Sequence, residues 1–87
     1  MISSITYSQL DRLFGALGFE VASSGHPGQV YRHPESGVII VLAMRRPTDL
    51  VSSADLMSAR RHLIERGLLD DDIFWEFAST GAIPANR

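Results

Sequence analysis

The chain has 87 residues, which is the length of a single domain. Hydrophobic residues make up 45% of it and charged residues 21%, a balance that excludes a disordered acidic-tail protein or a low-complexity linker protein. There is no cysteine, which excludes a disulfide framework, a thiolate nucleophile and a zinc site of the cysteine type. The formal net charge of -2 lacks the basic excess that general nucleic-acid binding requires.

No segment of the sequence predicts contact with a membrane. The longest apolar run, Val38 to Met44, is far shorter than the roughly 20 residues that cross a bilayer. The N-terminus also lacks the order of a signal peptide, in which a charged stretch precedes an apolar one. We therefore expect a cytoplasmic protein that does not bind membranes.

Residues 6–17 are predicted to form the first helix. Thr6 and Gln9 have the spacing of a capping box, in which the two side chains satisfy each other's backbone N–H groups. Gly18 is expected to end the helix. An apolar stripe at helical spacing is formed by Leu10, Leu13, Phe14 and Leu17.

Three short strands are predicted to follow as an antiparallel meander, with Phe19 and Val21 on one face of the first. They span Phe19–Ser23, Gln29–His33 and Val38–Met44. The turns at 24–28 and 34–37 are short enough for hairpins, whereas a parallel crossover needs a dozen or more residues.

The third strand is apolar on both faces. One face would carry Val38, Ile40, Leu42 and Met44, and the other would carry Ile39, Val41 and Ala43. Half-buried antiparallel strands usually alternate between apolar and polar residues. We therefore expect the second apolar face of this strand to be covered as well. It would come from a homodimer, from a protein partner, or from a third helix of the same chain.

A second helix is predicted over about 53–66 and a short third helix after Asp70. Ser52 and Asp55 have cap spacing, and Gly67 is the expected stop. The stripe of the second helix is Leu56, Ala59 and Leu63, widened by Met57 and Ile64. In the third helix, Asp70 caps the start, Asp71 and Asp72 complement the helix dipole, and Ile73, Phe74 and Phe77 share a face.

These elements predict an α+β fold of the order α-β-β-β-α, with a three-stranded antiparallel sheet, helices on one face and a short C-terminal third helix. The chain 1–87 would be a single domain with a core of about 6–79. Residues 80–87 are expected to be a flexible tail.

The chain resembles the small HicA toxins, also called the YcfA-like family. The resemblance runs from Tyr7 to Ala78 and depends on the element order and on two phrases. These are Tyr31-Arg32-His33-Pro34 and Leu63-Ile64-Glu65-Arg66-Gly67-Leu68, the second followed by Phe74. It implies a fold like the double-stranded-RNA-binding domain, together with mRNA cleavage or translation arrest that a HicB-type antitoxin neutralises.

The family's active histidine usually stands in a Gly-Ser/Thr-His phrase, and the nearest match here is Ser24-Gly25-His26. The small residues are in reverse order. Counting back from Tyr31 places Gly28 in the usual histidine column, unless Pro27-Gly28 is an insertion. The resemblance therefore implies either a metal-independent endoribonuclease or a related protein with degenerate catalysis.

Histidine suits RNA self-cleavage because its pKa is near neutrality and the reaction needs no metal. His26 is the first candidate, with an exposed turn histidine as the alternative. His33 is the second, with a structural histidine before a proline as the alternative. His26, His33 and Glu35 show no further converging metal ligands, and helix-dipole contacts explain the aspartates at 70–72, so we expect neither a metal nor a cofactor.

Four arginines, Arg45, Arg46, Arg60 and Arg61, are the candidate RNA-binding set, because a loop and the following helix can converge on one phosphate backbone. The alternative is a solvated helix face. Trp75 is a candidate for stacking on a base or a partner, with a peripheral core position as the alternative.

The sequence is consistent with two functions. The first is a HicA-like RNA-acting protein of a toxin-antitoxin type system. The second is a non-catalytic binding or assembly module that uses Ile39, Val41 and Ala43 to dimerise or to dock an antitoxin-like protein.

Overall fold

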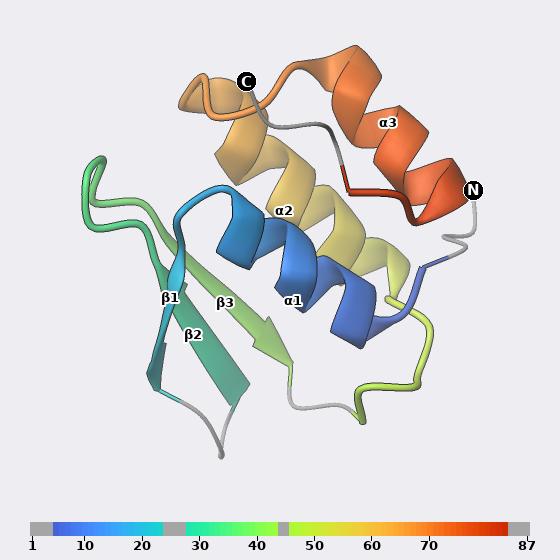
Figure 1. Ribbon diagram of the computed structural model, residues 1–87. Coiled ribbons are helices and arrows are strands. Elements are labelled where there is room, and N and C mark those ends of the chain that lie inside the picture. The colour runs from blue at the N-terminus through green and yellow to red at the C-terminus, as the bar shows by residue number, and fades with distance from the viewer. Residues whose placement is uncertain (1–4, 24–27, 44–45, 84–87) are drawn as a thin grey trace.

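The computed structural model describes residues 5–23, 28–43 and 46–83. The elements are α1 (Tyr7–Ala16), β1 (Glu20–Ser23), β2 (Gly28–Arg32), β3 (Ile39–Ala43), α2 (Ser53–Glu65) and α3 (Asp71–Thr80). The strands form an antiparallel sheet in the order β1-β2-β3, and the helices lie on one face of it (Figure 1). This confirms the predicted α+β fold. No helix in these described ranges is long and apolar enough to cross a membrane.

The capping box predicted for α1 is present. The Thr6 hydroxyl accepts the Gln9 backbone N–H at 3.3 Å, and the Gln9 side chain accepts the Thr6 N–H at 2.9 Å. Because both bonds form within one turn, the start of α1 is fixed locally. The chain leaves the helix at Gly18, whose φ of 98° favours glycine, as predicted.

The register of the sheet decides which side of β3 is covered. Tyr31 is opposite Ile40 and Val30 is opposite Val41, and paired residues share a face. The buried face carries Tyr31, Val38, Ile40 and Leu42, whereas Ile39, Val41 and Ala43 are exposed. The predicted division of β3 into two apolar faces is therefore confirmed for residues 38–43. Met44 lies outside the described residues.

The first strand begins one residue later than expected. Phe19 precedes β1 and is buried, whereas Val21 lies opposite Tyr31 and is 51% exposed. Val21 shares the face of Tyr31 but lies on the edge strand, where fewer core side chains pack against it. The pairing also shifts between Val21 and Ser23, as in a β-bulge.

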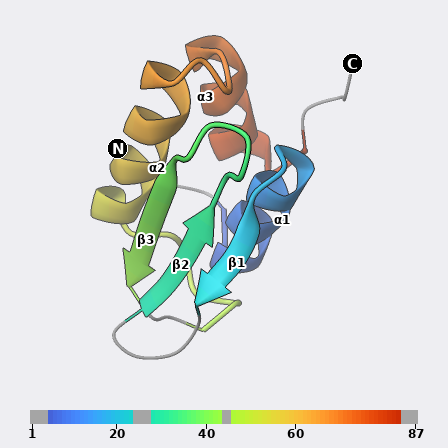
Figure 2. The same cartoon turned by 90° about the vertical axis from the view of Figure 1, so that its left-hand side faces the viewer.

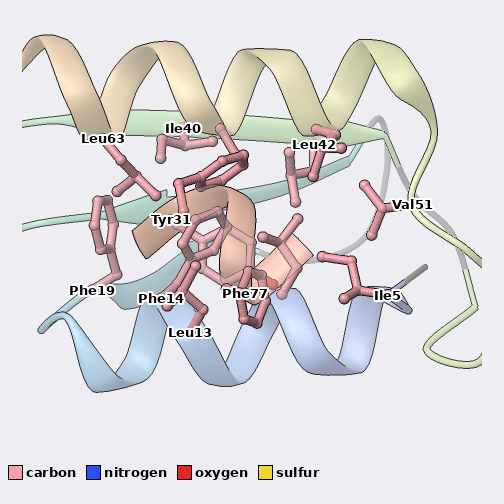
Figure 3. Close-up of a cluster of buried hydrophobic side chains, with 14 of the residues drawn as sticks. Ile5, Leu13, Phe14, Phe19, Tyr31, Ile40, Leu42, Val51, Leu63 and Phe77 are labelled. Carbon is pink, nitrogen blue, oxygen red and sulfur yellow. The ribbon is translucent and has the colours of Figure 1, made fainter. Parts of the chain in front are cut away.

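The core lies between the sheet and the three helices (Figure 3). Phe14 is fully buried and contacts two aromatic rings, Phe19 at 5.2 Å and Tyr31 at 4.7 Å between centroids. Such tilted aromatic pairs add to the free energy gained by burial. The helices contribute further fully buried side chains, among them Leu10, Leu13, Leu63, Phe74 and Phe77.

The inner stripe of α2 is as predicted except at one residue. Leu56, Ala59 and Leu63 are buried, and Ile64 packs against the core. The prediction that Met57 widens this stripe is wrong, since its side chain is 47% exposed. Met57 is one position after Leu56, about 100° further around the helix, and so faces away from the sheet.

The third helix lies on the same side of the sheet as α1 and α2 (Figure 1). Phe74 and Phe77 are fully buried, as predicted, and Ile73 is half-buried. Asp70 occupies the N-cap position, but its side chain makes no capping hydrogen bond, so that part of the prediction is wrong. Because α3 is on the helix side, it does not cover the exposed face of β3.

A contact that the sequence did not predict joins the start of the chain to the segment before α2. The Val51 N–H donates to the Ile5 carbonyl at 2.9 Å, and the Tyr7 N–H donates to the Asp49 carbonyl at 3.0 Å. Thr6 and Leu50 form an isolated antiparallel bridge between these bonds. The segment therefore holds the first turn of α1 close to the first turn of α2.

Candidate functional site

His26 and Arg45 lie outside the described residues, but the neighbouring strand bears on the histidine assignment. Gly28 is the first residue of β2 and pairs with Ala43. A Cβ at position 28 would collide with the backbone carbonyl oxygen of Leu42. The described pairing of β2 and β3 therefore leaves no room for a histidine at position 28, the family's usual histidine column, and it does not test His26.

His33 is buried directly after β2. It is 6% exposed, and its ring packs on Phe19 with centroids 5.0 Å apart. Nε2 lies 3.0 Å from the Leu17 carbonyl oxygen, which can only accept, so we assign the proton to Nε2. Nδ1 then accepts from Ser36 in the following turn. Both ring nitrogens are engaged within the chain, which favours the structural alternative for His33.

The three described arginines of the candidate RNA-binding set each face an acidic side chain. Arg60 Nε is 2.9 Å from an Asp71 carboxylate oxygen. The corresponding distances are 3.4 Å for Arg46 and Asp49 and 3.7 Å for Arg61 and Glu65. Acidic partners lower the positive potential available to a phosphate.

These arginines also belong to different parts of the fold. Arg46 lies in the loop before α2, whereas Arg60 is seven residues beyond the helix start, about 10 Å along the axis. Arg60 also lies over the Trp75 ring, 5.7 Å from its centroid. Trp75 packs against the core and contacts Phe74 edge-on, as expected for its peripheral core alternative.

The exposed side of the sheet is named here the outer face. It carries Glu20, Val30, Arg32, Ile39, Val41 and Ala43. Ile39 and Val41 are 53% and 56% exposed, and the described helices all lie behind the sheet (Figure 2). Beside these aliphatic side chains, Arg32 forms an ion pair with Glu20 at 3.1 Å. The outer face thus combines an apolar centre with one acid and one base.

A cavity of about 250 Å³ lies on the other side of the sheet, between α1, the strands and the loop before α2. The residues that line it are Tyr7, Ser8, Asp11, Gln29, Tyr31, Leu42, Ala43 and Pro47. Helical spacing places the first three on one side of α1. The sequence did not predict this cavity, because its wall combines segments that are far apart in the chain.

A chain of hydrogen bonds runs along the wall of the cavity. The Tyr31 hydroxyl donates to Asp11 Oδ1 at 2.7 Å and accepts from Gln29 Nε2 at 3.2 Å. Burial raises the pKa of Tyr31 above its ordinary value, and the hydrogen bond to Asp11 raises it further. Tyr31 therefore keeps its proton at neutral pH and acts as the donor to Asp11.

Tyr7 links the cavity wall to the start of α2. Its hydroxyl donates to Asp55 Oδ2 at 2.6 Å and accepts the Ser52 backbone N–H at 3.2 Å. The Ser52 side chain caps α2 by accepting the Asp55 N–H, as predicted. The Tyr7 ring is thus held in place by bonds at its far end.

No protein-family model, curated protein or solved structure matches this chain. Within residues 5–23, 28–43 and 46–83, no three acidic or histidine side chains are grouped so that they could hold a metal ion. The α+β fold, the outer face and the cavity are therefore the observations on which a function can be proposed.

Proposed function

We propose that this protein is a non-catalytic binding module that associates with a second copy of itself through the outer face. The observation that carries the proposal is the exposure of Ile39 and Val41, both above one half, on a sheet face that no described helix covers. The solvent side of an antiparallel sheet is ordinarily polar. Adjacent exposed aliphatic side chains are typical of a surface that another molecule covers.

The charges on the outer face favour a second copy as the occupant. The face carries one acid and one base, Glu20 and Arg32, beside its apolar centre. In a two-fold dimer the same patch meets itself, so the apolar centres pack together and each Glu20 can approach the other copy's Arg32. A partner selected by charge would instead require a patch of one sign.

The size of the face predicts how tight the dimer is. Three strands about 4.8 Å apart, with four or five residues at about 3.3 Å each, present on the order of a few hundred Å². A standard stable interface buries about 800 Å² per partner. We therefore expect a dimer that dissociates on dilution through the micromolar range.

Light scattering on the wild type and on Val41→Asp tests the proposal. The wild type should approach dimer mass at high micromolar concentration, and Val41→Asp should stay monomeric because it buries a charge at the interface. Leu50→Asp is the matched control, since Leu50 is 58% exposed but lies in the loop before α2, and it should dimerise normally. A wild type that is monomeric throughout overturns self-association.

The second candidate function is a HicA-like protein that acts on RNA within a toxin-antitoxin type system. The observation that favours it is the α-β-β-β-α order with helices on one sheet face, because this is the arrangement that the HicA resemblance implies. His26 would be its catalytic group, and Arg45, Arg46, Arg60 and Arg61 would hold the phosphates.

Expression of the wild type and of His26→Ala separates the two candidates. The binding module predicts normal growth with both proteins and no RNA binding at low salt, where electrostatic affinity is greatest. Growth arrest with RNA cleavage by the wild type, lost in His26→Ala but kept in His62→Ala, would establish the RNA-acting candidate. His62 suits the control because its ring bonds to the Ser58 carbonyl within α2.

A further inference from the structure

We infer that the cavity between α1 and the sheet binds a cationic group, either an ammonium or a guanidinium. The group would come from a small free amine or from a lysine or arginine side chain of a peptide. The cavity is on the helix side of the sheet and shares only Ala43 with the outer face, and no step of this inference uses the proposed dimer.

The charge of the wall favours a cation. Asp11 is the charged residue among the eight described residues that line the cavity, and the others are tyrosine, serine, glutamine, leucine, alanine and proline. Asp11 is exposed, whereas Tyr31 at the inner end is buried. The carboxylate therefore lies at the mouth, where it attracts cations and repels anions.

The direction of the hydrogen bonds points to a ligand that donates. Gln29 donates to Tyr31, and Tyr31 donates to Asp11, so the chain of bonds ends on a carboxylate. A carboxylate has about four acceptor positions, and the bond from Tyr31 uses one of them. Ammonium and guanidinium groups are donors without acceptors, and charge-assisted bonds to carboxylates are the stronger class.

The rings and the size of the cavity define the rest of the ligand. Tyr7 and Tyr31, which are 8% and 5% exposed, line the cavity, and cations bind favourably to aromatic rings. Leu42 and Pro47 provide apolar surface for a short methylene stem. A volume of about 250 Å³ is below the usual range of roughly 300–1,000 Å³ for drug-sized ligands. The cavity therefore suits one side chain or one small amine.

Butylguanidinium and butylurea are matched probes, because they have nearly the same shape and differ in charge. In an NMR titration, butylguanidinium should give saturable shifts at the Gln29 side-chain amide and the Tyr31 backbone amide, with a Kd on the order of millimolar. Butylurea should give none, and added salt should weaken the binding of butylguanidinium.

Asp11→Asn removes the charge while keeping an oxygen that can accept the Tyr31 hydroxyl, and it should weaken butylguanidinium binding by about tenfold or more. Asp72→Asn is the matched control on α3, an exposed aspartate away from the cavity, and should bind as the wild type does. Equal binding of butylurea, unchanged binding by Asp11→Asn, or no saturable shift up to about 100 mM would overturn the inference.

A capped arginine tripeptide distinguishes the two sources of the cation. Tighter binding than butylguanidinium, with shifts extending from Gln29 to residues around the mouth such as Ser8, supports a polypeptide side chain. Binding that is equal or weaker supports a small free amine. Both results require the loss of binding in Asp11→Asn.

Discussion

Position 28 shows how a single glycine can be required by the backbone of the neighbouring strand. A Cβ at Gly28 would meet the Leu42 carbonyl, whereas a Cβ at Gly15, on the surface of α1, would meet no atom within 4 Å. Gly28→Ala should lower the free energy of unfolding by about 1–3 kcal/mol. Gly15→Ala should raise it by about 0.5–1 kcal/mol, because alanine is the better helix former.

Urea unfolding followed by circular dichroism measures both changes. The two alanine variants add the same methyl group, so opposite signs would show that its effect depends on the position: a collision with β3 at position 28 and a gain in helix propensity at position 15. A Gly28→Ala protein as stable as the wild type would mean that β2 and β3 do not approach as closely as described.

Tyr31 should make stability depend on pH in the alkaline range. Its pKa is raised in the folded chain above the ordinary value near 10, so the unfolded chain loses this proton first. The stabilising contribution of the protonated hydroxyl is therefore complete below about pH 10 and is lost as the pH rises further through the folded value.

Comparison with Tyr31→Phe isolates this effect. The variant should be about 1 kcal/mol less stable than the wild type at pH 8, since the hydrogen bond to Asp11 is lost. The difference should shrink as chemical unfolding is repeated at rising pH above 10. If the difference in unfolding free energy between the two proteins stays constant above pH 10, the pKa of Tyr31 is not raised by folding.

For contacts between single residues, the sequence is predictive only where the two partners are close in the chain. The capping box of Thr6 and Gln9 lies within three residues, and its spacing alone predicts it. The Tyr31 to Asp11 bond joins residues 20 apart, and no local pattern distinguishes Asp11 from any exposed helical acid. The cavity residues were missed for the same reason.

Among the elements, α3 is an integral part of the core. Phe74 and Phe77 are fully buried, and Arg60 of α2 bonds Asp71 of α3 across the helix pair. Phe74→Ala should therefore lower the free energy of unfolding by about 3–5 kcal/mol. Ile73→Ala, at the half-buried neighbouring position, should cost clearly less.

Thermal unfolding of both variants measures this difference. If Phe74→Ala has the same melting temperature as the wild type, α3 is not packed on the core. A chain that ends before α3 would then keep the fold. A large loss confined to Phe74→Ala would show that α3 belongs to the same cooperative unit.

The elements themselves were predictable because hydrophobic periodicity is a local signal. The stripe of Leu10, Leu13 and Phe14 and the short turns between strands were sufficient for α1 and for antiparallel pairing. In β3 both faces are apolar, so periodicity could not choose between them. The choice depends on the register with β2, where Tyr31 is opposite Ile40 on the side of the helices.

In the whole molecule, the sheet separates two surfaces with different chemistry. The outer face is apolar with one ion pair. The cavity on the helix side has a chain of hydrogen bonds along its wall that ends on the Asp11 carboxylate. Among the residues that the structure describes, neither surface has the excess of unpaired arginine that phosphate binding requires.

The central claim is that the outer face is covered by a second copy, and methyl accessibility tests it in the unaltered protein. A soluble paramagnetic agent broadens the NMR signals of exposed methyl groups. As the protein is concentrated from low to high micromolar, the methyl groups of Ile39 and Val41 should become protected, while those of Leu50 stay broadened. Ile39 and Val41 that remain as accessible as Leu50 at every concentration would contradict the account.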